Sequence, residues 1–114
     1  MIFFKPNVRL KRYTPAIRFI LETLDNLNRL KIPNYPEDWV ITSVNDSVHK
    51  KDSKHYLDLA VDMRSKNFEN ENRKEEFRDR LEFAMGNKFT VLYENPGGEN
   101  QHFHIQVKKG MVYP

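Results

Sequence analysis

The sequence predicts an α+β fold, in which a small, mainly antiparallel sheet has two helices packed on one side. Two segments repeat apolar residues at helical spacing, and several short segments are rich in β-branched and aromatic residues. Turn-forming residues separate these segments. With 114 residues, of which 39% are hydrophobic, the chain can bury one modest core. We therefore expect a single domain over residues 1–114.

The first predicted helix begins at Thr14 and Pro15, because threonine caps helices and proline suits the first helical position. Ile32 and Pro33 are expected to end this helix, and a turn then leads to a short buried strand at residues 39–42. The helix has one apolar stripe, formed by Ile17, Ile20, Leu21, Leu24, Leu27 and Leu30.

Three further strands are predicted beyond this point. Residues 43–54 are polar and have no period, so we expect a loop there, followed by an apolar strand at residues 57–63. Residues 89–93 favour another strand, and the turn-rich segment 95–98 separates it from a last one. In residues 102–107 polar and apolar side chains alternate, which is typical of a strand with one exposed face.

A second helix is predicted between the second and third strands. Asn70 can cap its beginning, and Gly86 is placed to end it in the left-handed conformation. Phe77, Leu81 and Met85 are expected on its inner face.

The composition excludes several classes of site and of partner. The chain has no cysteine, so disulfides, thiolate zinc sites, cysteine nucleophiles and iron–sulfur clusters are excluded, and a transition metal needs His, Asp or Glu ligands. The net charge of +3 favours anionic partners, but the basic residues are scattered, so we expect no nucleic-acid binding. No run approaches the roughly 20 apolar residues that span a bilayer, so we expect no membrane insertion.

The N-terminal residues carry no apolar stretch behind a basic start, so the sequence predicts no secretory signal and synthesis in the cytoplasm. The sequence does not determine the oligomeric state, and we expect a monomer.

Three histidines and one aspartate, in a particular order along the chain, point to metal chemistry. His102 and His104 share one face of the last strand, and Asp62 interrupts an apolar strand, where a carboxylate is costly unless it is paired or binds a metal. His55 lies where the polar loop meets that strand. Taken singly, these are also consistent with exposed histidines and with a salt bridge from Asp62 to Arg64. Together they supply the three protein ligands of a hydrolytic zinc site.

These residues belong to two motifs that resemble the zinc D-Ala-D-Ala peptidase superfamily, which includes the family M15 carboxypeptidases, phage endolysins and the zinc-binding hedgehog domain. The motifs are Ser53-x-His55-x-x-Asp58-x-Ala60-x-Asp62 and, on the last strand, His102-x-His104. The family usually has glycine where this chain has Asp58. The resemblance covers nearly the whole chain and implies a hedgehog/DD-peptidase-like fold.

By position, the resemblance implies that His55, Asp62 and His104 bind Zn²⁺. It also implies that His102 stabilises the developing oxyanion or orients water, and that Ser53 contacts the substrate near its carboxylate or scissile amide.

Two glutamates are candidates for the catalytic base. Glu99 stands three residues before His102, a spacing seen in many members of the family, and Glu94 ends the preceding strand, which is also a common position. Some relatives place the acid where this chain has Gln101, which cannot act as a base. We favour Glu99 and keep Glu94 as the alternative.

The resemblance implies a zinc metallopeptidase that cuts the peptides of bacterial peptidoglycan. The cleaved bond would be D-Ala-D-Ala or L-Ala-D-Glu, and the place of action the bacterial cell wall after a phage-type release. A catalytically inactive zinc-binding domain is the alternative, and a small basic nucleic-acid-binding protein is a more distant one.

Overall fold

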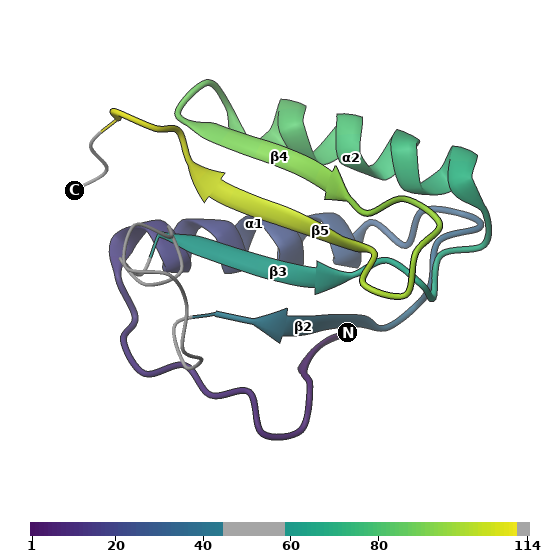
Figure 1. The fold of residues 1–114 in the computed structure, drawn as a ribbon, viewed down its shortest axis with the longest axis horizontal. Coiled ribbons are helices and arrows are strands. Elements are labelled where there is room, and N and C mark those ends of the chain that lie inside the picture. The colour runs from purple at the N-terminus through teal and green to yellow at the C-terminus, as the bar shows by residue number, and fades with distance from the viewer. Residues whose placement is uncertain (45–58, 112–114) are drawn as a thin grey trace.

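The computed structural model describes residues 1–44 and 59–111 and has an α+β architecture, with a five-stranded mixed sheet and two helices. The strands lie in the order β1-β2-β3-β5-β4 across the sheet, and both helices pack behind it (Figure 1). In chain order the elements are β1 Ile2–Phe4, α1 Pro15–Arg29, β2 Trp39–Ser43, β3 Ala60–Arg64, α2 Glu71–Met85, β4 Phe89–Glu94 and β5 His102–Val107. The predicted α+β class is confirmed.

The sheet is mainly antiparallel, as predicted, because β2–β3, β3–β5 and β4–β5 all pair in that direction. The exception is β1, which pairs in parallel with β2 and aligns Ile2 with Trp39. Strand β1 is not predicted from the sequence. Three residues are too few to show a period of two, and parallel pairing needs a partner far along the chain.

Helix α1 begins as predicted and ends earlier. The Thr14 hydroxyl accepts a hydrogen bond from the Ile17 amide at 3.2 Å, and Pro15 occupies the first turn. The last helical residue is Arg29, so the predicted end at Ile32 and Pro33 is wrong. Leu30 is 65% exposed and does not belong to the buried stripe. The chain turns at Lys31, which has a positive φ of 51°.

Helix α2 agrees with the prediction at both ends. The Asn70 side chain accepts a hydrogen bond from the Arg73 amide at 2.9 Å, and Gly86 follows the helix with φ 83°, a region that glycine tolerates best. Phe77, Leu81 and Met85 are buried, as predicted. They belong to the same core cluster as the inner residues of α1 and the apolar side chains of the sheet.

Strand β5 separates this core from the outer face of the sheet. Phe103, Ile105 and Val107 are buried, whereas the alternate residues His102 and His104 are only partly buried, so the predicted alternation is confirmed. The polar side of the sheet is therefore the side away from the helices (Figure 1). In the described ranges, no helix is long and apolar enough to cross a membrane.

Candidate active site

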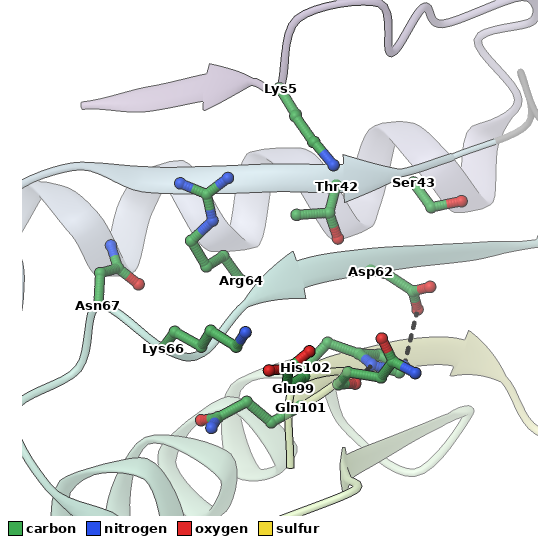
Figure 2. A pocket seen from close by; sticks show the side chains of 11 residues that line it. Lys5, Thr42, Ser43, Asp62, Arg64, Lys66, Asn67, Glu99, Gln101 and His102 are labelled. Atoms are coloured by element: carbon green, nitrogen blue, oxygen red, sulfur yellow. Dashed lines mark hydrogen bonds and ion pairs between the residues drawn. The ribbon is translucent and has the colours of Figure 1, made fainter. Parts of the chain in front are cut away.

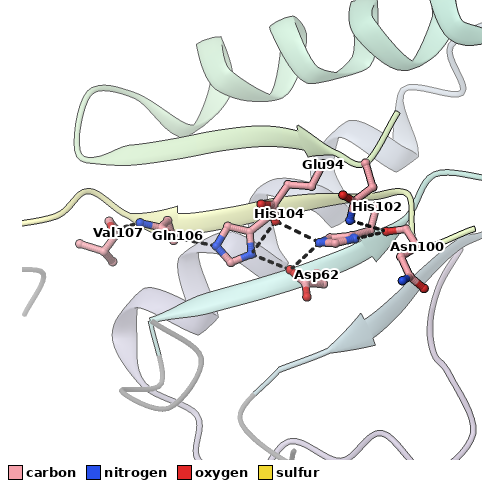
Figure 3. A network of polar contacts seen from close by, with 8 residues as sticks. Asp62, Glu94, Asn100, His102, His104, Gln106 and Val107 are labelled. Carbon is pink, nitrogen blue, oxygen red and sulfur yellow. Dashed lines mark hydrogen bonds and ion pairs between the residues drawn. The ribbon is translucent and has the colours of Figure 1, made fainter. Parts of the chain in front are cut away.

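Sheet pairing brings four of the predicted site residues to one place on the outer face. Asp62 on β3 lies directly opposite His104 on β5, and Glu94 on β4 lies directly opposite His102. Directly opposed residues on one face have Cβ atoms about 4.5–5.5 Å apart, so their side chains meet. Figure 3 shows the four side chains gathered over β3, β4 and β5, and we call them the histidine cluster.

The tightest contact in the histidine cluster joins Asp62 and His104. The distance from Asp62 Oδ1 to His104 Nδ1 is 2.6 Å, and the two side chains are 17% and 12% exposed. The other ring nitrogen of His104, Nε2, lies 2.7 Å from Oε1 of Gln106. Both ring nitrogens of this histidine therefore face an oxygen that accepts hydrogen bonds.

This environment favours positive charge at His104. Burial alone lowers the pKa of the His104 imidazole, but the hydrogen bond and charge of Asp62 raise it, and the Gln106 hydrogen bond and the charge of Glu94 act in the same direction. The net result is a pKa above the ordinary value of histidine.

The Asp62 and His104 side chains also fit a metal ion as donors. Imidazole nitrogen and carboxylate oxygen are both zinc ligands, and His104 Nδ1 and Asp62 Oδ1, which share a hydrogen bond here, would face a bound ion together once Nδ1 has lost its proton. Metal-binding histidines usually donate their other ring N–H to an oxygen, which is the place that Gln106 takes here. Among the described residues, no group of three or more such side chains is arranged to hold a metal.

The remaining predicted ligand and the predicted substrate contact lie outside the described residues. These are His55 and Ser53, and Asp58, the departure from the family pattern, lies there too. Strand β3 begins at Ala60, so the predicted start of this strand at residue 57 also falls outside.

His102 and Glu94 form the second contact of the histidine cluster. Nε2 of His102 lies 3.0 Å from Oε1 of Glu94, and Nδ1 lies 2.6 Å from the Asn100 carbonyl oxygen. A carbonyl oxygen can only accept, so Nδ1 is the ring nitrogen that donates, and Nε2 is the nitrogen that faces the Glu94 carboxylate. Glu94 Oε1 is also 3.9 Å from His104 Nδ1, which places this carboxylate between the two rings.

Glu99, the glutamate that the sequence favoured as the base, does not lie beside the two histidines as Glu94 does. It is exposed on the loop between β4 and β5, and no hydrogen bond or ion pair joins its side chain to either histidine in the described part of the chain. It lines the cleft beside His102 instead (Figure 2). The geometry therefore favours Glu94 over Glu99 as the carboxylate within reach of both rings.

A cleft of about 840 Å³ opens in front of Asp62 and His102. It runs from the ends of β1 and β2 across β3 to the loop before β5 (Figure 2). Ser43 of β2 lies opposite Asp62 at an irregularity in the strand pairing. The lining residues are Lys5, Thr42, Ser43, Asp62, Arg64, Lys66, Asn67, Glu99, Asn100, Gln101 and His102.

A second polar cluster, centred on Gln101, supports the loop before β5. Oε1 of Gln101 lies 2.7 Å from Nζ of Lys74 and 3.0 Å from the Ser65 hydroxyl. Tyr93 donates a hydrogen bond to Glu71 at 2.7 Å and lies 3.3 Å from Gln101 Oε1, and Lys74 forms an ion pair with Glu71. We call these five residues the Gln101 cluster.

Sequence reasoning missed the supporting residues of both clusters. The alternation of β5 places Gln106 on the same face as the two histidines, and this signal could have identified Gln106 as a partner of His104. Nothing in the sequence distinguishes Lys74, which is 7% exposed, from the other charged residues of α2.

No family model, curated protein or solved structure matches this chain.

Proposed function

We propose that the chain is a zinc-dependent metallopeptidase that hydrolyses peptide bonds of bacterial peptidoglycan. The observation that carries the proposal is the contact of Asp62 with His104, because the two motifs assign both residues as zinc ligands and the sheet pairs them. A hedgehog/DD-peptidase-like fold is part of the same proposal. It is supported by the order of helices and strands and by the position of the motifs on β3 and β5.

In this proposal His55, Asp62 and His104 hold the zinc ion, and Gln106 fixes the ring of His104. When bound, zinc supplies Lewis-acid chemistry, because it lowers the pKa of water and polarises a carbonyl group. Glu94 accepts the proton of the attacking water and returns it to the leaving amine. This role is supported by its position within 3.0 Å of His102 and 3.9 Å of His104.

His102 acts beside Glu94. Its protonated Nδ1 is held by the Asn100 carbonyl, so Nε2 is the nitrogen directed at Glu94. A proton on Nε2 would let His102 donate a hydrogen bond to the negative oxygen that develops on the substrate, once Glu94 has turned to the proton of the attacking water. Ser53 is proposed to contact the substrate, and the place of action is the bacterial cell wall.

The direct test is mass spectrometry of the peptides released from purified peptidoglycan, with and without a chelator. We expect new termini at D-Ala-D-Ala or L-Ala-D-Glu bonds, their loss with the chelator, and their recovery when zinc is restored. Asp62→Asn and His104→Ala should release nothing, whereas Asp79→Asn, an exposed aspartate on α2, should release as much as the unchanged protein.

Two other results would replace the proposal. Zinc binding without any hydrolysis would indicate the inactive zinc-binding domain. Hydrolysis that is indifferent to chelators and to Asp62→Asn would contradict the assigned site altogether.

A further inference from the structure

Three cationic side chains line the cleft in front of the histidine cluster, and they come from different segments. Lys5 follows β1, Arg64 ends β3, and Lys66 lies two residues beyond it. Figure 2 shows Lys5 and Arg64 extending over β2, and Lys66 near the segment that carries His102. In residues 1–44 and 59–111, no hydrogen bond or ion pair engages these three side chains.

This lack of partners distinguishes them from the arginines of the helices. Each of those arginines forms an ion pair with a carboxylate on its own helix, at 2.7–3.7 Å. These are Arg18 with Glu22, Arg29 with Asp25, Arg73 and Arg80 with Glu76, and Arg78 with Glu82. Arg64 is partly buried as a residue, and no hydrogen bond or ion pair within the described part of the chain engages its guanidinium. A ligand oxygen would accept hydrogen bonds from it.

Arg64 stands one step away from the proposed reaction centre. It is two residues beyond Asp62 on the same face of β3, which corresponds to about 6.6 Å along the strand, and it lies directly opposite His102. An extended peptide also advances by about 3.3 Å per residue. A substrate group bound by Arg64 would therefore lie a few residues along an extended peptide from a bond held at Asp62 and His104.

The chemistry of the cleft favours a carboxylate as that group. A guanidinium binds a carboxylate through two parallel N–H···O bonds, and two lysines nearby add positive charge. Asp62 and Glu99 line the same cleft, so its charge is mixed, and this disfavours a run of closely spaced phosphates more than it disfavours a single carboxylate placed at Arg64.

We propose that Arg64, with Lys5 and Lys66, binds a free carboxylate of the peptide substrate a few residues from the cleaved bond. The identity of that bond rests on the proposed function, but the binding itself needs no metal.

The test is a binding titration of the metal-free full chain, from which the chelator has been removed by gel filtration. The probes are the peptide L-Ala-γ-D-Glu-L-Lys-D-Ala, the same peptide with every carboxylate amidated, inorganic phosphate and a short DNA duplex. We expect the acidic peptide to bind about tenfold or more tightly than the amidated one, since hydrogen bonds to charged groups are the strong ones.

Variants assign the effect to the cleft. Arg64→Gln should weaken binding of the acidic peptide about tenfold and leave the amidated peptide unchanged. Arg64→Lys, which keeps the charge without the planar fork, should recover part of the loss. Lys109→Gln removes one charge from an exposed site outside the cleft and should change nothing.

Equal binding of both peptides, or equal losses in Arg64→Gln and Lys109→Gln, would overturn the inference. Tighter binding of phosphate or of the DNA duplex than of the acidic peptide would also overturn it. Because no turnover is measured, carboxylate binding without hydrolysis of peptidoglycan would remove only the proposed function. Hydrolysis without carboxylate selectivity would remove only this inference.

Discussion

The two polar clusters beside the start of β5 differ in their balance of charge. In the Gln101 cluster the ammonium of Lys74 faces both a carboxylate of Glu71 and an amide oxygen, so charges and hydrogen bonds are matched. In the histidine cluster the carboxylates of Asp62 and Glu94 face imidazole rings, and positive charge there comes from a proton on His104, whose pKa is raised, or from a bound cation. One cluster holds a fixed positive charge, and the other can exchange a proton for a cation. The difference separates a structural support from a candidate reaction centre.

The largest effect is expected from the carboxylate between the two rings. Glu94→Gln keeps the shape of the side chain and removes the base, so hydrolysis of peptidoglycan should fall by about 10²–10⁴-fold while zinc content stays the same. Glu99→Gln is the matched control, because Glu99 lines the cleft without contacting either histidine, and it should change the rate by less than tenfold. The reverse pattern, measured by release of peptides, would make Glu99 the base.

A smaller effect is expected from Gln106, which supports the histidine cluster without belonging to it. Gln106→Leu removes the oxygen that holds His104 Nε2, and loss of such an outer partner typically costs about 10–100-fold in metal affinity. Thr90 lies directly opposite Gln106 on β4, so Thr90→Val is the control and should bind zinc normally. Competition with a fluorescent chelator measures both. Identical affinities would show that Gln106 does not orient His104.

The Gln101 cluster is expected to affect stability rather than metal binding. Lys74→Met leaves part of the hydrogen-bonding capacity of Gln101 and Glu71 unmet, so the free energy of unfolding should fall by about 1–3 kcal/mol. Arg80→Met removes an exposed ion pair of the same helix and should cost less than about 1 kcal/mol. Urea denaturation compares the two. A Lys74→Met protein of unchanged stability would contradict the structural role of the cluster.

The smallest effect is an alkaline loss of stability from Tyr93. Burial and the hydrogen bond to Glu71 raise the pKa of the Tyr93 hydroxyl to about 12, from about 10 in an unfolded chain. The unfolded state then releases its proton first, so the contribution of Tyr93 to stability is full below pH 10 and is lost between pH 10 and pH 12. Tyr93→Phe should reduce this fall, measured by thermal unfolding from pH 9 to 11. Tyr35, whose pKa is also raised to about 12, supplies the fall that remains.

Local signals in the sequence were sufficient for most of the fold. Asn70 and Gly86 marked the ends of α2, and the alternation of β5 placed both histidines on the outer face. Strand β1 could not be found in this way, because its three residues have no pattern and its partner β2 lies more than 30 residues away. The end of α1 was misplaced because Leu30 continues the apolar spacing although the helix has already ended.

In the candidate site, too, the sequence identified some residues, and others could be assigned only from the tertiary structure. The motifs named Asp62 and His104 from their spacing, and the antiparallel register explains how they meet. The choice between Glu94 and Glu99 depended on which of them lies opposite His102, and this depends on the number of residues in the loop between β4 and β5. The Gln101 cluster joins residues from four separate segments, and no local sequence pattern predicts hydrogen bonds between segments so far apart in the chain.

The central claim is that Asp62 and His104 hold a zinc ion, and its most direct test is the metal content of the purified protein. The measurement is elemental analysis after dialysis against buffer with one equivalent of zinc, on the unchanged chain and on Asp62→Ala, His104→Ala and Asp79→Ala. The account predicts one zinc per chain in the unchanged protein and in Asp79→Ala, and far less than one in the other two. Zinc that is absent from the unchanged chain, or equally present in all four proteins, would contradict it.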